Sequence, residues 1–197
     1  MEITAGMVKE LRAKSGAGIM ECKQALTEAN GDTEEAVVIL RKKGLARAGK
    51  KSDRETGDGA IGAYIHPGSK IGVMVQLCCE TDFVANTPDF QELLKDIGMH
   101  IAASKTRFIH RDEVSEDDLS REREIFAHQA RESGKPDNII EKIVSGKMEK
   151  FYEENCLLDQ PFIKNPDLTV QELIKQKIAV LGENIVVGKF ARFEISK

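Results

Sequence analysis

Aromatic residues are scarce in this sequence: they make up 5% of its 197 residues, and tryptophan is absent. Single-stranded nucleic acids are usually bound by stacking aromatic side chains beside a stripe of lysine and arginine. The formal net charge of −4 also provides no attraction for a phosphate backbone. These features rank a nucleic-acid-binding factor last among the function classes, and we expect no direct contact with nucleic acid.

Long apolar runs are missing as well. The first 14 residues, MEITAGMVKELRAK, contain no stretch that suits a signal peptide, and no later stretch is long enough to span a bilayer. We therefore expect a cytoplasmic protein without a membrane partner.

The sequence offers few residues for catalysis or metal binding. Its four cysteines include no C-x-x-C pair, and its four histidines, at positions 66, 100, 110 and 128, have no metal-ligand spacing. Cys78 and Cys79 are neighbours on a predicted strand, so their side chains point to opposite faces and cannot ligate one ion together. We expect no cofactor, no bound metal and no active site, which means that the protein is not an enzyme.

Residues 1–46 are predicted to form a module of three short helices. Thr4 is placed to cap the first helix, whose inward face carries Leu11. An S-G-A-G sequence ends this helix, Asp32 starts the third one, and Gly44 follows the last apolar residue of the third. A unit of this size is near the lower limit for a self-sufficient core, so a docking module is more plausible than an enzyme.

The rest of the chain is predicted to form a linker and an α+β core domain. Residues 47–59 alternate in charge and contain almost no apolar side chains, which is typical of a solvated linker. Within the core, residues 60–197, we expect strands at 60–66, 71–79 and 184–195. We expect helices from Pro88, capped by Thr87, to about Ser104, at about 115–156 as a helical hairpin, and after Thr169. The fold class is therefore α+β, with the three-helix module followed by a small antiparallel three-stranded sheet packed with helices and the hairpin.

The corner between the second strand and the following helix, residues 80–87, allows two interpretations. In the first, Thr81 and Asp82 turn the chain while Phe83 packs under the next helix as a hydrophobic staple. In the second, the aromatic ring beside a carboxylate projects from the surface as an interface wedge. The spacing alone favours the first interpretation and leaves the second open.

Several segments together resemble the translation elongation factor Ts family. The most specific are LRAKSGAGIMECKQALTEANGDTEEAVVILRKKG near the N-terminus and TDFVAN after the hairpin of strands. MHIAASK, SGKP, DQPFIKNP and ENIVVGKFARFE support the match. The likeness extends over essentially the whole chain and is to the short bacterial members of the family.

This resemblance implies a function and a partner. Members are guanine-nucleotide exchange factors for elongation factor Tu: they bind the GDP form of that GTPase, disturb its Mg²⁺ site and promote release of GDP. Their N-terminal module resembles a ubiquitin-associated fold and docks on the GTPase domain. Carried onto this sequence, the segment that dislocates the Mg²⁺ is Thr81, Asp82, Phe83 and Val84. The implied partner contacts are Leu11, Arg12, Ile19, Met20 and Lys23, with His66 on the strand hairpin as a secondary candidate.

Two features depart from the family pattern. Asn86 stands where the family often carries a basic residue. Longer members also contain two copies of the small sheet, whereas this chain has one. Short members compensate by dimerising, so the resemblance implies a homodimer.

A second function class stays open beside the exchange factor. The three-helix module on its own suits a protein-binding adaptor that holds a partner without altering it. The two classes differ in one observable: an exchange factor accelerates GDP release at substoichiometric amounts, whereas an adaptor leaves the off-rate unchanged.

Overall fold

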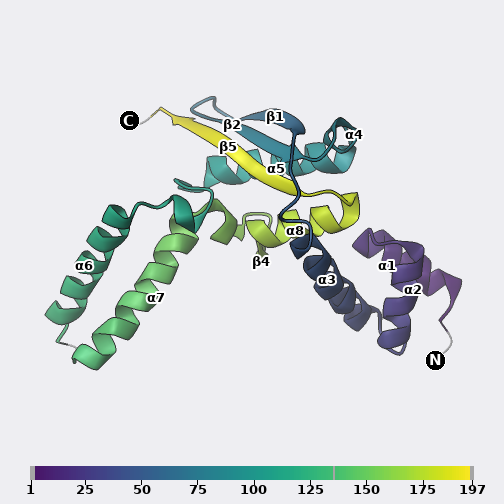
Figure 1. The fold of residues 1–197 in the computed structure, drawn as a ribbon, viewed down its shortest axis with the longest axis horizontal. Coiled ribbons are helices and arrows are strands. Elements are labelled where there is room, and N and C mark those ends of the chain that lie inside the picture. The colour runs from purple at the N-terminus through teal and green to yellow at the C-terminus, as the bar shows by residue number, and fades with distance from the viewer. Residues whose placement is uncertain (1–2, 135, 196–197) are drawn as a thin grey trace. The chain divides into compact units, whose positions relative to one another are not determined.

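The computed structural model describes residues 3–134 and 136–195, which form two compact units. The first unit comprises the chain up to Ile61 together with Gln76–Leu94 and Glu172–Gly188. The second comprises Gly62–Val75, Lys95–Gln171 and the chain from Lys189 onward. Strands β1 (Asp58–Ile65), β2 (Ile71–Cys79) and β5 (Ile185–Glu194) form an antiparallel sheet in the order β1-β2-β5 (Figure 1). The predicted α+β class and three-stranded sheet are confirmed.

Three helices open the first unit: α1 (Ala5–Ser15), α2 (Ile19–Glu28) and α3 (Thr33–Gly49). The predicted caps are present. The Thr4 hydroxyl accepts a hydrogen bond from the N–H of Met7, and the Asp32 carboxylate accepts from the first turn of α3. One apolar cluster holds the three helices together; its buried members are Leu11, Cys22, Ala25, Leu26, Ala29, Ala36 and Leu40.

The third helix extends beyond residue 46, the predicted end of the three-helix module. Helix α3 continues to Gly49, and Gly44 lies buried in its interior. The reason is a close approach to α8 (Val170–Leu181), the helix expected after Thr169. A Cβ added at Gly44 would lie 3.2 Å from the Cβ of Ala179, so glycine serves here to let two helices meet. Residues 47–49 of the predicted linker are therefore helical.

A substitution at Gly44 tests this packing. We expect Gly44→Val to lower the free energy of unfolding by about 1–3 kcal/mol, because the added atoms force α3 away from α8. The matched control is Gly146→Ala in α7 (Asp137–Asn155), where no atom lies within 4 Å of the added Cβ. That change should stabilise by about 1 kcal/mol through helix propensity. Urea denaturation of both variants measures the two effects, and an undiminished stability of Gly44→Val would contradict the packing argument.

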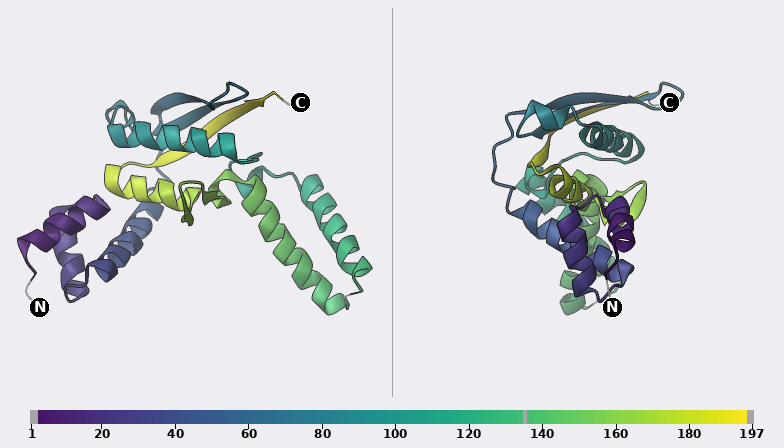
Figure 2. Two further views of the ribbon diagram at one scale, coloured as in Figure 1. Left: turned by 180° about the vertical axis from the view of Figure 1, so that it is seen from behind. Right: turned by 90° about the vertical axis from the view of Figure 1, so that its right-hand side faces the viewer.

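The second unit contains the predicted helical hairpin, seen from behind in Figure 2. Helix α6 (Glu116–Glu132) starts at Ser115, whose hydroxyl accepts a hydrogen bond from the N–H of Asp118, and α7 returns beside it. The predicted turn at 133–137 includes Lys135, which lies outside the described residues. The apolar cluster at the base of the hairpin consists of Val114, Leu119, Met148, Phe151 and Cys156.

Helix α5 (Pro88–Ala103) begins as predicted, because the Thr87 hydroxyl accepts a hydrogen bond from the N–H of Phe90. In the second unit its later turns pack on one face of the sheet. A Cβ at Gly98 would lie 3.2 Å from Tyr64 on β1 and 4.0 Å from Val75 on β2. Five short elements were not predicted: α4 (Asp82–Ala85), the 3-10 turns Arg111–Glu113 and Leu157–Asp159, and the paired strands β3 (Pro161–Phe162) and β4 (Asn165–Thr169).

Among the described residues, no helix combines the length and apolar character that crossing a membrane requires.

Candidate functional site

Phe83 projects from the first unit at the corner between β2 and α5. Its side chain is 82% exposed, the highest value among the large apolar residues of the described chain. The hydrophobic-staple interpretation of Phe83 is therefore wrong. The ring sits on α4, a single helical turn, with the exposed Asp82 immediately before it. The alternative, a ring and a carboxylate displayed together at one bend, is the arrangement that the structure has.

The corner is anchored although its ring is exposed. Ala85 is buried, and its carbonyl accepts a hydrogen bond of 2.8 Å from the side-chain amide of Gln91. The Thr87 hydroxyl donates to the carbonyl of Val84, also at 2.8 Å. Thr81 is tied by its N–H and its hydroxyl to the carboxylate of Glu183. A one-turn helix has little stability of its own, so these contacts fix the direction in which Phe83 points.

The three-helix module displays a second exposed apolar site. Met20 is 75% exposed and Ile19 is 57% exposed, both at the start of α2. Arg12 and Lys23 are exposed nearby and, with Ile19, help to line a cleft of about 400 Å³ between α1 and α2. Three of the five residues expected here thus line one cleft, and Met20 is exposed next to Ile19.

Leu11 is the exception. It has 0% exposed surface and belongs to the core of the module. The structure shows Leu11 as a core residue on the helix that carries Arg12, and a partner contact through Leu11 stays a prediction.

His66 lies in the second unit, at the end of β1, and is exposed. Its Nδ1 is 3.4 Å from the hydroxyl of Tyr64, and the two ring centroids are 6.2 Å apart. The imidazole is thus accessible and braced by one aromatic neighbour. It belongs to a different unit from Phe83 and the three-helix module.

His100 is the one buried histidine of the described chain, and its contacts are structural. Its Nδ1 accepts a hydrogen bond of 3.2 Å from the N–H of Ile163, so Nε2 carries the proton and donates to the side-chain oxygen of Gln160 at 2.8 Å. The Thr106 hydroxyl donates to the same oxygen. Burial lowers the pKa of His100, and the hydrogen bond with Gln160 opposes that shift. Every polar atom of the ring is already engaged within the fold.

This histidine predicts an acid-sensitive stability. Because the pKa of His100 is lower in the folded chain than the value of about 6.5 in an unfolded one, its contribution is complete above that value and is lost as the pH falls through the folded-state pKa. Urea midpoints between pH 8 and pH 5 should therefore fall with acid in the wild type, and less steeply in His100→Gln. His128→Gln, at an exposed position, is the control and should keep the wild-type slope. Equal slopes in all three proteins would contradict this role.

The cysteines lie in protected positions. Cys22, Cys79 and Cys156 are buried, and Cys78 is half-buried. Burial, followed by the Glu183 carboxylate, raises the pKa of the Cys79 thiol, and burial raises the pKa of Cys156 to about 11. Both shifts disfavour the reactive thiolate. Among the described residues, no group of three or more cysteine, histidine, aspartate or glutamate side chains could hold a metal ion.

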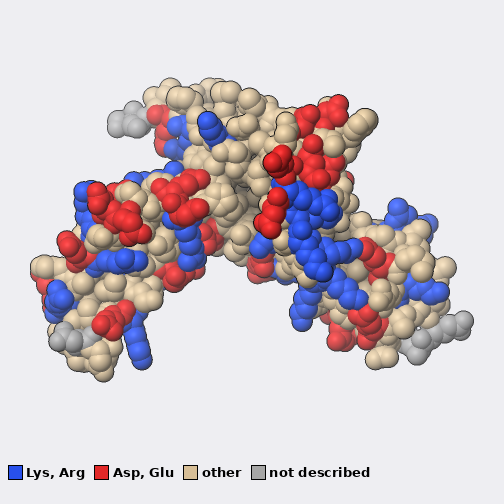
Figure 3. Space-filling view, in the orientation of Figure 1, with Lys and Arg blue, Asp and Glu red and all other residues tan. Residues whose placement is uncertain are grey.

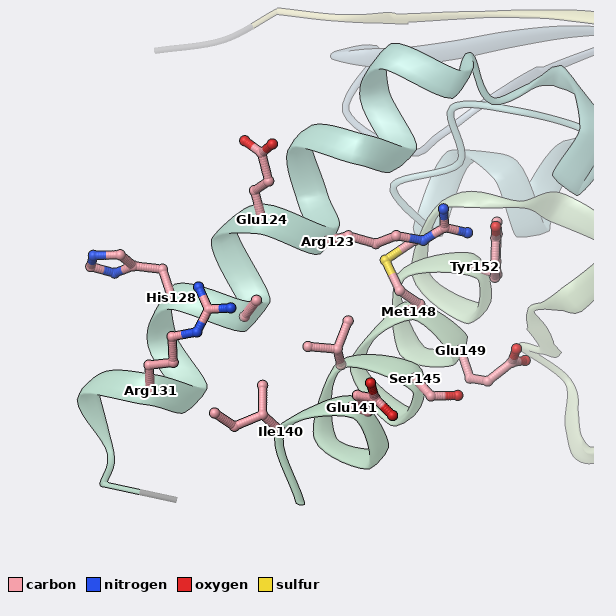
Figure 4. A pocket seen from close by; sticks show the side chains of 12 residues that line it. Arg123, Glu124, His128, Arg131, Ile140, Glu141, Ser145, Met148, Glu149 and Tyr152 are labelled. Atoms are coloured by element: carbon pink, nitrogen blue, oxygen red, sulfur yellow. The ribbon is translucent and has the colours of Figure 1, made fainter. Parts of the chain in front are cut away.

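A cleft of about 870 Å³ lies between α6 and α7. Its floor includes Ile140 and Met148, both buried. Figure 4 shows Glu124 and His128 pointing away from α7, and His128 pairs instead with Glu132 on its own helix at 3.6 Å. The acidic and basic groups of this cleft do not converge on a common point.

Basic side chains gather along α3, as Figure 3 shows. Several of them are ion-paired with carboxylates of the same unit: Arg41 with Glu172, Lys43 with Glu28, and Arg47 with Glu21. These pairs join α3 to α8 and to α2. These three basic side chains are thus engaged in contacts within the unit.

The fold and its surface define a class: a small α+β protein whose candidate sites are exposed side chains, such as Phe83 and Met20, on elements that the fold holds in place. The model of the family described as Elongation factor TS matches residues 4–197. Elongation factor Ts of Acetivibrio thermocellus is 57% identical over 98% of this chain and 89% of its own length. Elongation factor Ts of Geobacter sulfurreducens is 55% identical over 100% and 91%, and that of Fervidobacterium nodosum is 54% identical over the full length of both chains. The chain belongs to the elongation factor Ts family, a family of translation elongation factors.

Proposed function

We propose that this protein is a guanine-nucleotide exchange factor for elongation factor Tu. It binds the GDP-bound GTPase in the cytoplasm, disturbs the Mg²⁺ site and promotes release of GDP during translation elongation. The observation that carries this proposal is Phe83: a large aromatic ring, 82% exposed, on a short turn that internal hydrogen bonds hold in place. Solvating such a ring is unfavourable, so its display favours a role in contact with another molecule.

The mechanism follows from how GTPases hold their nucleotide. Mg²⁺ bridges the phosphates, and its small, near-ideal octahedral coordination tolerates little displacement of its ligands. We propose that Phe83 wedges between elements of the partner near this ion, while Asp82 fixes the approach and Thr81 and Val84 support the turn. Because coupling between two ligands is reciprocal, tight binding of a new nucleotide then expels the factor. A tenfold weakening of GDP binding requires about 1.4 kcal/mol of coupling.

The docking step is assigned to the three-helix module, which we propose to be of the ubiquitin-associated type. Its cleft has apolar walls, and Lys9, Arg12 and Lys23 are among the residues that line it. This composition suits an apolar helix or loop that also carries carboxylates. Ile19 and Met20 would supply apolar contact area, and His66 would reach a different domain of the partner.

We further propose that the protein is a homodimer that uses the outer face of its sheet. In the second unit, Tyr64 and Val75 face α5, and Arg192 donates hydrogen bonds to the carbonyls of Ile101 and Ala102 on that helix. Residues that alternate with these three must therefore point away from α5. The outward set is apolar and exposed: Ile65, Met74, Phe193 and Ile195. Apolar residues gathered on one sheet face are typical of a protein–protein contact.

A charge on the outer face of the sheet, at Phe193 of β5, tests the dimer. We expect Phe193→Glu to shift the protein to monomer, because a carboxylate without a partner cannot be buried in an apolar interface. The control is Ile163→Glu in the β3–β4 turn, a similarly exposed apolar position outside the sheet. Sedimentation equilibrium over a range of concentrations distinguishes the two variants. A wild type that remains monomeric at all concentrations would refute the proposal.

The alternative function, an adaptor without exchange activity, is favoured by the module's exposed surface alone. It does not account for the anchored Phe83 turn, which lies outside that module. Release of fluorescent GDP from elongation factor Tu separates the two functions. An exchange factor accelerates the release at substoichiometric amounts, and an adaptor leaves the rate unchanged.

A further inference from the structure

A junction of three chain segments lies directly beneath the Phe83 turn. The segments are residues 51–54 after α3, Glu80 and Thr81 after β2, and residues 182–184 between α8 and β5. All three belong to the first unit, and they are separated by up to 132 residues in sequence. Loops that a rigid scaffold holds in position often carry binding residues.

Glu183 forms hydrogen bonds with Thr81, the residue immediately before α4. One carboxylate oxygen accepts a hydrogen bond of 3.0 Å from the N–H of Thr81, and the other accepts one of 2.7 Å from the Thr81 hydroxyl. A threonine at this position normally uses its hydroxyl to cap the helix that follows. Here Thr81 makes no side-chain cap bond to α4, because its hydroxyl is directed to Glu183. Local capping has been replaced by a charge-assisted, bidentate bond from a distant segment.

Asn184 connects the same region to the chain segment that follows α3. It is buried, and its side-chain amide donates to the carbonyls of Ser52 and Arg54 at 3.2 and 2.8 Å. Its backbone N–H donates to the Glu80 carboxylate at 2.7 Å. The chain after α3 is thus bonded to the side chain of Asn184, and Thr81, just before the Phe83 turn, is bonded to the side chain of the adjacent Glu183.

We propose that Glu183 is a positioning residue that holds Phe83 in the orientation its contact with the partner requires, with Asn184 fixing that orientation relative to α3. The inference rests on the proposed function and adds a residue outside the segment assigned to Mg²⁺ dislocation. Without Glu183, the N–H and hydroxyl of Thr81 lose their acceptor. The first residue of the turn is then held less firmly, and the ring samples directions that do not meet the partner.

The test compares three variants in the GDP-release assay with elongation factor Tu. Glu183→Ala removes both acceptor oxygens, and Glu183→Gln keeps one. Glu172→Ala removes a carboxylate near the start of α8, where Glu172 pairs with Arg41. We expect Glu183→Ala to lower the maximal acceleration at saturating protein about tenfold, the scale of losing hydrogen bonds to a charged group. Glu183→Gln should fall between it and the wild type, and Glu172→Ala should match the wild type.

A merely structural role would show a different pattern. Docking is assigned to the three-helix module, so Glu183→Ala should bind the partner almost as tightly as the wild type does. The protein concentration that gives half-maximal acceleration should therefore change less than about twofold, while the maximal acceleration falls. Thr81→Val, which removes the hydroxyl, should act in the same direction and add little when combined with Glu183→Ala. A Glu183→Ala variant with the wild-type maximal rate and only a lower melting temperature would overturn the proposal.

Amide hydrogen exchange of the free protein gives a readout that does not depend on the partner. The N–H groups of Ala85 and Asn86 donate to the carbonyls of Thr81 and Asp82 within the turn. In Glu183→Ala they should exchange about tenfold faster, while amides of α7 stay unchanged. Unchanged exchange at Ala85 and Asn86 would overturn the positioning role. If the wild type itself fails to accelerate GDP release, the proposed function fails, and the exchange rates still decide whether Glu183 holds the turn.

Discussion

Phe83→Ala is expected to reduce the acceleration of GDP release by about 30-fold or more, which corresponds to the loss of about 2 kcal/mol at an interface hot spot. The ring is the only large part of the turn that reaches outward, so its removal leaves nothing to insert into the partner. Its effect on folding should be small: substitution of an exposed side chain typically changes the free energy of unfolding by less than about 0.5 kcal/mol. Stopped-flow release of fluorescent GDP and a urea titration measure the two quantities.

The matched control for Phe83→Ala is Phe90→Ala, seven residues later. Phe90 is fully buried on α5, so its truncation should cost about 3–5 kcal/mol of stability. The two phenylalanines therefore separate activity from stability. A Phe83→Ala protein that is strongly destabilised, or that keeps full exchange activity, would contradict the assignment of this ring.

Truncation of the exposed apolar pair of the three-helix module should give the second large effect. The double variant Ile19→Ala/Met20→Ala is expected to weaken binding to elongation factor Tu by about 30-fold or more, because central apolar contacts dominate interface energies. Its stability should remain close to that of the wild type, since both side chains are mainly exposed. Isothermal titration with the GDP form measures the affinity.

Leu11→Ala provides the contrast on the same module. Its side chain is fully buried, so we expect a loss of about 2–5 kcal/mol of stability, with any loss of binding arising from unfolding of the module. Lower temperature should partly restore its binding and should not restore that of the double variant. Unchanged affinity of Ile19→Ala/Met20→Ala would refute docking through this face.

Elements with local signals were predictable from the sequence. Thr4, Asp32, Thr87 and Ser115 each cap a helix as expected, because capping depends on residues within one turn. The strand hairpin around Pro67-Gly68 follows from turn chemistry in the same way. The exposed Ile19 and Met20 were named through the family resemblance, and the structure brings Ile19 into one cleft with Arg12 and Lys23.

What the sequence could not supply depends on residues far apart in the chain. The need for a glycine at position 44 becomes clear only from the approach of Ala179 on α8. Strands β3 and β4 contain two prolines and resemble a loop; one of their supports is the bond from the N–H of Ile163 to His100, 63 residues away. Spacing alone favoured a buried Phe83, because a staple and a wedge have the same local pattern. Glu183 and Asn184 carry no local signal at all, since their partners lie more than 100 residues away.

The rate of GDP release from elongation factor Tu, measured with and without this protein, tests the central claim most directly. The account predicts that a small molar fraction of the protein accelerates release many-fold, and that an equal amount of Phe83→Ala does so far less. An off-rate that stays the same while the two proteins bind each other would contradict it, and would leave the chain as an adaptor.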